Sequence, residues 1–236
     1  MHVKSQWKLV YESLKSDIES GKIAPGARLP TEHELSGQMS VSRNTVRRAY
    51  LALSQDGAIR IVNGRGSFAM RADVTYEIDA VSRFRDVLEQ QGLSSSLRLM
   101  DTSTVLADDG LATRLHVDVE TLVLSQTSVI MGDGVPFILT TRYFPADLIE
   151  RFQEKLLQTR SFTQVLAEAG LGELRRKSTT VGARLADERE AALLECPQNA
   201  LLLDVTATGA LADGRVVEWQ HAVMNSRLIK LSFTSD

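Results

Sequence analysis

Apolar residues recur three and four positions apart at the start of the chain. They are Trp7, Val10, Tyr11, Leu14 and Ile18, and this spacing predicts a helix that Gly21 ends. A connector with two prolines follows at residues 23–30. The next residues, Thr31 to Glu34, have the form of a capping box, which predicts a short second helix through about Gln38.

A third helix is predicted to begin after Ser42, because a serine at this place can cap it. Its buried stripe consists of Val46, Ala49, Tyr50 and Leu53. Long polar side chains gather on the opposite face, near the positive end of the helix dipole: Arg43, Asn44, Arg47 and Arg48. A helix that reaches base edges in a DNA major groove needs these properties.

A hairpin is predicted to follow the third helix, with short strands at residues 58–62 and 66–70. Gly64 at its tip allows the backbone to approach a groove closely, and Arg65 can lie on phosphate or enter the minor groove. Helices followed by a hairpin occur in many folds, and surface arginines are often merely solvated. Periodicity and charge therefore leave DNA binding and a purely structural role open.

The remainder of the chain alternates long strand patterns with short helical ones. Asp-Gly pairs at 133–134 and 213–214 lie between alternating apolar runs, which predicts two hairpins. Helices are expected at 83–91, 107–116, 147–157, 161–169 and 187–194, and further strands at 97–106 and 174–185. Residues 71–77 show no helical stripe, and we expect a linker there. Antiparallel strands with helices segregated between them predict an α+β domain over residues 78–236.

Composition is that of an ordinary globular protein of one or two domains, with 43% apolar and 24% charged residues. The chain has no apolar run of membrane-spanning length and no signal-peptide core, so we expect a cytoplasmic protein without membrane contact.

The net charge of −3 conceals an asymmetry between the two parts of the chain. Residues 1–70 carry ten lysines and arginines against six aspartates and glutamates, whereas the remainder is acidic. This asymmetry favours an N-terminal arm that binds a polyanion.

The sequence carries no motif for catalysis or metal binding: no glycine-rich phosphate loop, metal-ligand cluster or nucleophile elbow. The lone Cys196 excludes an internal disulfide and a cysteine-rich zinc module. His116 and His221 lie far apart in the sequence, and we interpret both as ordinary, partly buried histidines. We therefore expect no catalytic residue, no metal and no cofactor.

The segments GARLPTEHEL (26–35), VSRNTVRRA (41–49) and GRGSF (64–68) resemble the GntR family of bacterial repressors in order and spacing. The resemblance implies a winged helix-turn-helix domain over residues 1–70 that binds a palindromic operator as a homodimer. It implies DNA contacts by His33, Ser42, Arg43, Asn44, Thr45, Arg47 and Gly64, with Arg48 and Arg65 expected on phosphates. Arg43 is expected on bases and Arg47 on phosphate. The alternative is that each of these two pairs with Glu32 or Glu34 inside the protein.

The region from residue 78 onward resembles the UTRA effector-sensing domain of the HutC subfamily, which is related in fold to chorismate lyase. The matching segments are Asp133–Pro136, Tyr143–Pro145, Ala183–Asp187 and Gly214–Glu218. Other segments resemble regulators of phosphonate metabolism of the PhnF type: 83–85, 143–146, 160–162 and 175–180. Members that bind sugar phosphates carry two arginines where this chain has Ser128 and Ile130, which counts against an amino-sugar phosphate.

Arginines recur beside the starts of the expected strands and helices, and a buried anion needs such bidentate donors. They are Arg83, Arg85, Arg142, Arg176 and Arg184, with Ser82, Thr140, Ser178 and Thr180 as candidate hydroxyl partners. Glu218 matches a position that often faces the pocket, where it could pair with the amine of an aminoalkylphosphonate. The alternative is that the arginines pair with surface carboxylates and that Glu218 faces solvent.

We therefore expect a dimeric, ligand-responsive repressor controlled by a small anionic effector, with a phosphonate as one candidate. One alternative is a UTRA-type regulator of sugar, amino-acid or histidine catabolism with another effector. Another is an enzyme with the lyase fold, although fold does not imply chemistry and no acid–base pair stands out. A third is an architectural DNA binder without sequence preference.

Overall fold

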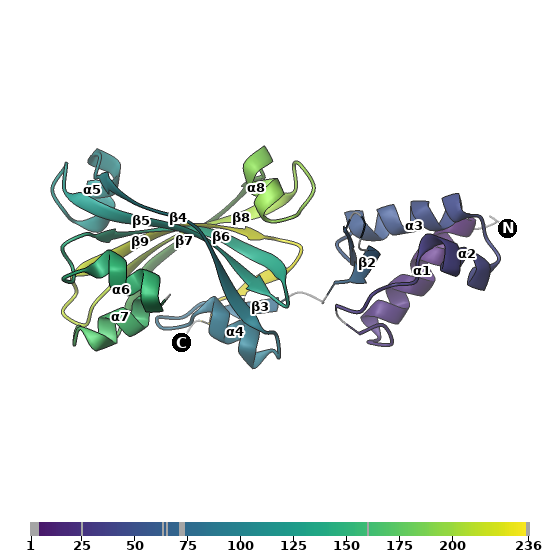
Figure 1. Cartoon of the computed structure of the whole chain (residues 1–236), viewed down its shortest axis with the longest axis horizontal. Coiled ribbons are helices and arrows are strands. Elements are labelled where there is room, and N and C mark those ends of the chain that lie inside the picture. The colour runs from purple at the N-terminus through teal and green to yellow at the C-terminus, as the bar shows by residue number, and fades with distance from the viewer. Residues whose placement is uncertain are drawn as a thin grey trace. The chain divides into compact units, whose positions relative to one another are not determined.

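The computed structural model describes residues 5–24, 26–62, 64, 66–70, 74–159 and 161–234. The chain forms two compact units, Met1–Val74 and Thr75–Asp236 (Figure 1). Among the described helices, none combines the length and the apolar character that crossing a membrane requires.

In the N-terminal unit, the described residues form three helices and a hairpin. These are α1 (Gln6–Glu19), α2 (Glu32–Met39), α3 (Arg43–Gln55), β1 (Ile59–Val62) and β2 (Gly66–Ala69). The apolar stripes of the helices meet in one core that includes Val10, Leu14, Leu35, Val46 and Leu53. The connector before α2 lies along the hairpin, where the Leu29 N–H donates to the Ser67 carbonyl oxygen at 2.8 Å. This is the predicted winged helix-turn-helix.

Side-chain caps fix the ends of the helix-turn-helix. The Thr31 hydroxyl accepts a bond from the Glu34 N–H, and the Glu34 carboxylate accepts one from the Thr31 N–H. The bond from the Thr31 N–H, together with one from the Thr31 hydroxyl to the same carboxylate, lowers the pKa of Glu34. Ser40 ends α2 with a left-handed φ of 54°, and Ser42 caps α3 by accepting from the Thr45 N–H at 3.1 Å. Both N-terminal caps were predicted from the sequence.

An antiparallel sheet forms the centre of the C-terminal unit. Within the described residues it has six strands in the order β4-β5-β6-β9-β8-β7. They are β4 (Ser95–Leu106), β5 (Leu122–Gly132), β6 (Val135–Pro145), β7 (Arg175–Leu185), β8 (Leu201–Ala210) and β9 (Val216–Asn225). β3 (Val74–Glu77) pairs separately with β10 (Ile229–Ser232).

Helices lie on both faces of this sheet (Figure 1). α5 (Asp109–Leu115) and α8 (Glu188–Leu193) lie on one face, and α4 (Phe84–Gln90), α6 (Phe152–Thr159) and α7 (Phe162–Glu168) on the other. Strand alternation explains the division: Val123 and Tyr143 pack with α5, whereas Leu124 and Phe144 pack with α6 and α7. The unit is the predicted α+β domain.

The two halves of the sheet repeat one another, which the hydrophobic pattern did not reveal. Residues 106–122 and 185–201 align without a gap, and each begins with Leu-Ala-Asp. Asp108 caps α5 and Asp187 caps α8. Each half runs strand, helix, strand, strand, so β4-β5-β6 corresponds to β7-β8-β9. β6 and β9, the last strand of each half, pair at the centre of the sheet.

The structure differs from the sequence-based expectation of a linker at residues 71–77. Residues 71–73 lie outside the described residues, but residues 74–77 form β3. Tyr76 in this strand is 4% exposed, and its ring centre lies 5.2 Å from that of Phe84. The lack of a helical stripe does not distinguish a linker from a short strand with alternating burial. In addition, the helix expected at 147–157 begins only at Phe152.

Replacing Thr31 by alanine is expected to lower the free energy of unfolding of the N-terminal unit by about 1 kcal/mol, because α2 loses its cap. Urea unfolding followed by Trp7 fluorescence, in a Trp219→Phe background, measures the change. Thr31→Ser keeps the hydroxyl and is the control, with a loss of less than about 0.5 kcal/mol. Equal losses in both variants would contradict a capping role.

Candidate functional sites

The start of α3 presents the side chains predicted to contact DNA. Most of them are exposed, namely Ser42, Arg43, Asn44, Arg47 and Arg48, while Thr45 is half-buried. Within the described residues, the Arg43 side chain makes no hydrogen bond or ion pair. Ser42 and Thr45 bind each other through their hydroxyls, 2.8 Å apart. Arg43 is therefore the cation on this surface that is available to a partner, whereas the two hydroxyls also hold the helix end together.

Arg47 pairs with Glu32 of α2, one of the two alternatives that the sequence left open. Its Nε donates to Glu32 Oε1 at 3.1 Å, and its Nη2 lies 3.1 Å from Glu32 Oε2. The carboxylate raises the pKa of Arg47. Because the Arg47 side chain is 63% exposed, water screens this pair and weakens it. A DNA phosphate can therefore compete for the same guanidinium.

The other predicted DNA contacts lie around α3. Arg48 lies over the Trp7 ring, with its guanidinium carbon 4.6 Å from the ring centre, a cation–π contact that orients it. His33 is exposed on α2. Gly64 at the hairpin tip has φ 74°, a conformation that favours glycine. Arg65 lies outside the described residues.

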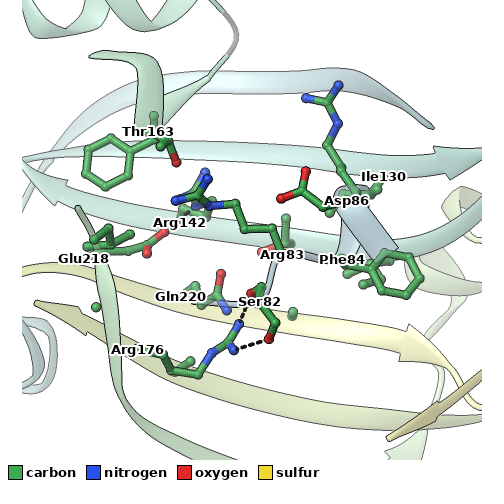
Figure 2. A pocket seen from close by; sticks show the side chains of 18 of the residues that line it. Ser82, Arg83, Phe84, Asp86, Ile130, Arg142, Thr163, Arg176, Glu218 and Gln220 are labelled. Carbon is green, nitrogen blue, oxygen red and sulfur yellow. Dashed lines mark hydrogen bonds and ion pairs between the residues drawn. The ribbon is translucent and has the colours of Figure 1, made fainter. Parts of the chain in front are cut away.

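A cavity of about 510 Å³ lies in the C-terminal unit, on the face of the sheet that α4 and α7 cover. Alternate residues of β5, β6 and β9, with residues of β8, form its floor. Residues within 76–89, Thr159 and residues 161–164 contribute its walls. Figure 2 shows Arg83, Arg142, Arg176 and Glu218 around this space. A cavity of this size suits a small molecule.

Arg142 and Glu218 form an ion pair at the floor of the cavity, between β6 and β9. The guanidinium of Arg142 also lies over the rings of Phe144 and Phe162, 5.1 and 5.3 Å from their centres. Glu218 is only 6% exposed, and a buried carboxylate needs a cationic partner to remain charged. The pair is therefore a fixed polar anchor whose two charges largely offset each other.

Gly209 makes room for this anchor. It lies opposite Glu218 in the β8–β9 ladder. A Cβ at position 209 would lie 2.9 Å from Glu218 Oε2 and 2.9 Å from Leu174 Cδ1. Glycine is needed here for a close approach, and a larger residue would displace the carboxylate.

Arg83 lines the cavity as the residue that precedes α4. Its side chain makes no hydrogen bond or ion pair within the part of the chain that the structure describes, and Figure 2 shows it extending into the cavity. Arg85, also in the lining, makes a long bond from Nε to the Ser95 hydroxyl at 3.4 Å. Arg83 thus offers its full donor set to a ligand.

Arg176 lines the cavity but is already engaged by the segment 76–82. Its Nη1 donates to the Asp79 carbonyl oxygen at 2.7 Å and to Ser82 Oγ at 3.2 Å. Its Nη2 donates to Tyr76 Oη at 2.8 Å and to the Ser82 carbonyl oxygen at 3.3 Å. The bonds to Ser82 are visible in Figure 2.

Two residues expected at the effector site, Arg184 and Ser178, do not line the cavity. Arg184 binds the Glu190 carboxylate at 2.6 and 2.7 Å and lies 3.4 Å from Asp204. These contacts raise the pKa of Arg184 and lower that of Glu190. Arg184 therefore stabilises the start of α8 and does not contribute to the cavity.

A strand irregularity explains the position of Ser178. The register of β7 shifts between Arg176 and Ser178. Such a bulge moves the alternation of faces by one residue, so Thr179 lines the cavity with Arg176. Ser178 and the other hydroxyl candidate on this strand, Thr180, are exposed instead.

Several polar residues of the cavity were not singled out from the sequence. They include Gln126, Thr163, Thr179 and Gln220, beside the expected Ser82 and Thr140. Gln126 and Ser128 are 4% and 1% exposed, and both lie on the strand face that packs against helices. Polar residues at alternate positions of a core strand are the sequence feature that could have indicated them.

Potential metal ligands do not gather in the described residues: no group of three His, Cys, Asp or Glu side chains is close enough to hold an ion. His221 instead pairs with Asp204, with 2.6 Å between Nε2 and Oδ1.

Comparison with known proteins identifies both units. The model of the UTRA domain matches residues 90–230, and the model described as bacterial regulatory proteins, gntR family, matches residues 7–68. The chain belongs to the GntR family. This GntR regulator carries a UTRA domain, and the families and relatives that it matches are transcriptional regulators rather than enzymes.

The GntR assignment is supported along nearly the whole chain. An uncharacterised HTH-type transcriptional regulator of Rhizobium meliloti is 31% identical over 226 residues, which are 95% of this chain and 93% of that protein. The HTH-type transcriptional repressor PhnF of Mycolicibacterium smegmatis is 32% identical over 169 residues, 72% of this chain and 68% of that protein. The crystal structure of PhnF from Mycobacterium smegmatis matches with a TM-score of 0.64 at 25% identity, covering 96% of this chain and 99% of that one. These matches confirm the predicted likeness to PhnF.

Gly209→Ala is expected to lower the free energy of unfolding of the UTRA unit by about 1–3 kcal/mol, because the new Cβ must displace buried Glu218 and half-buried Leu174. Urea unfolding followed by Trp219 fluorescence, in a Trp7→Phe background, measures the change. The matched control is Gly182→Ala on β7, where a Cβ would meet the Asp204 carbonyl oxygen at an ordinary 3.7 Å. If Gly182→Ala lost as much stability, the close approach at Gly209 would not be the cause.

Proposed function

We propose that this regulator represses transcription by binding an inverted-repeat operator as a homodimer, under the control of a small anionic effector in the cavity. The single observation that carries the effector is Arg83, a cation in the cavity wall without a partner among the described residues. A half-buried arginine whose side chain no protein group neutralises is suited to an anionic ligand.

The proposed recognition helix is α3. Arg43 contacts base edges in the major groove, where an arginine can bind guanine through two bonds. Arg47 and Arg48 contact phosphates, and the remaining proposed contacts are His33, Ser42, Asn44, Thr45, Gly64 and Arg65. In a homodimer, two such helices fit half-sites about one helical turn apart, roughly 34 Å from centre to centre.

Arg43→Ala is expected to weaken operator binding by about tenfold or more and to relax base preference at the contacted position. The measurement is a gel-shift titration at fixed salt, with a duplex that the wild-type protein selects from a random pool. The control is Arg189→Ala, an exposed arginine near the start of α8 in the UTRA unit. Unchanged affinity of the Arg43 variant would remove this residue from the site.

The charges of the cavity favour a ligand that carries both signs. Among the described residues, seven charged side chains line it. The segment 76–82 already engages the Arg176 guanidinium, and the other six are Arg83, Arg85, Arg142, Asp86, Glu89 and Glu218. An oxyanion suits Arg83, and an amine suits Asp86 or Glu218. An aminoalkylphosphonate combines these groups.

Ser128 and Ile130 in the lining of the cavity bear on the choice of effector. Sugar-phosphate-binding members of the family carry arginines at these positions. Their absence supports a phosphonate over an amino-sugar phosphate. Effectors from sugar, amino-acid or histidine catabolism are the competing class.

In a thermal-shift screen, 2-aminoethylphosphonate is expected to stabilise the wild-type protein more than a sugar phosphate or urocanate does. Arg83→Ala should weaken its binding by about tenfold or more, because charge-assisted hydrogen bonds are lost. Arg215→Ala, at the exposed tip of the β8–β9 hairpin, is the control and should bind as the wild type. Stabilisation by urocanate alone would show that the phosphonate assignment is wrong.

A further inference from the structure

One arginine ties the first strand of the UTRA unit to the wall of its cavity. β3 is the element through which the chain enters this unit, and the segment 76–82 leads from it to α4. Arg176 makes four side-chain bonds to Tyr76, Asp79 and Ser82. Its backbone N–H also donates to the Ala80 carbonyl oxygen at 2.7 Å. A single residue of β7 therefore bonds to both ends of the entry segment, Tyr76 and Ser82.

The entry segment is itself a compact turn. The Asp79 carboxylate accepts bonds from the N–H groups of Val81 and Ser82 at 2.7 and 2.5 Å, and Ser82 Oγ accepts one from the Asp79 N–H at 3.0 Å. The N–H groups of Val81 and Ser82 and nearby Arg176 lower the pKa of Asp79. The turn is thus internally rigid, and Arg176 is its main attachment to the large sheet.

One end of the turn connects to an aromatic cluster, and the other connects to the proposed ligand contact. At one end, the Tyr76 ring packs on Phe84, and Phe84 packs on Phe137 with 5.7 Å between ring centres. At the other end, Ser82 is followed directly by Arg83, the proposed ligand contact. A displacement of Arg83 therefore acts on the turn first and on β3 through it.

We propose that Arg176 is a positioning residue that makes β3 and the cavity wall move as one body. An effector held by Arg83 then acts on the chain that leads to the DNA-binding unit. This inference rests on the proposed function and adds the residue through which the signal leaves the cavity. Without the Arg176 bonds, the effector still binds but the two binding events are no longer coupled.

Hydrogen exchange of the free protein tests the one-body arrangement without any ligand. In Arg176→Ala, exchange is expected to accelerate by about tenfold or more over the turn and over the described part of β3, since several hydrogen bonds are lost together. The matched control is Arg175→Ala, the preceding residue of β7, which is exposed and lies 3.7 Å from Glu173. Wild-type exchange in Arg176→Ala, or acceleration that stops short of β3, would overturn the proposal.

Operator titrations with and without 2-aminoethylphosphonate, and separately with inorganic phosphate, test the coupling. In the wild type and in Arg175→Ala, the stabilising anion is expected to change operator affinity by about fivefold or more. In Arg176→Ala this ratio falls to about one, while the same anion still raises the melting temperature. A wild-type ratio in Arg176→Ala would overturn the proposal.

The failure of the proposed function has a different signature. If neither anion changes the operator affinity of the wild type, the effector class is wrong, and the exchange measurement alone decides the role of Arg176. Tyr76→Phe removes one acceptor of Arg176 but keeps the ring beside Phe84. It should change exchange and coupling in the same direction, to a smaller extent, and it replaces Arg176→Ala if that variant does not fold.

Discussion

The UTRA cavity depends on one buried interaction, the ion pair between Arg142 and Glu218. Two charges beneath a layer of helices are tolerated because they meet each other and because aromatic rings cover the guanidinium. Gly209 gives the carboxylate the space to lie there. Because these two charges offset each other, Arg83 is the cavity arginine that we propose as the main contact of an anionic ligand.

Much of the fold could be predicted because the helix caps, the turn residues and the hydrophobic pattern all indicate the same helices and strands. The hydroxyls of Thr31 and Ser42 sit where helices need caps, and the Asp-Gly pairs sit where hairpins turn. Seven of the ten expected effector residues line the cavity: Ser82, Arg83, Arg85, Thr140, Arg142, Arg176 and Glu218. The arginines were predicted from their positions beside the starts of strands and helices, and Glu218 from the resemblance to the family.

The sequence-based expectations differ from the structure where contacts distant in the sequence, rather than the local residue pattern, determine the position of a residue. A bulge in β7 exchanges the faces of Ser178 and Thr179, and nothing in the residue pattern marks where a strand gains a residue. Arg184 has a carboxylate partner supplied by the cap of α8, which only the folded chain brings to it. β3 is too short for periodicity to reveal it, and pairing with β10, far along the chain, defines it.

The repeated halves of the sheet have a consequence for ligand orientation. In the matched registers of the two hairpins, Arg142 on β6 corresponds to Ala222 on β9, and Glu218 on β9 corresponds to Ile138 on β6. The scaffold is nearly symmetric, but its lining is not. The Arg142–Glu218 pair therefore has no counterpart at the repeat-related positions, and the repeat does not give a bound molecule two equivalent placements.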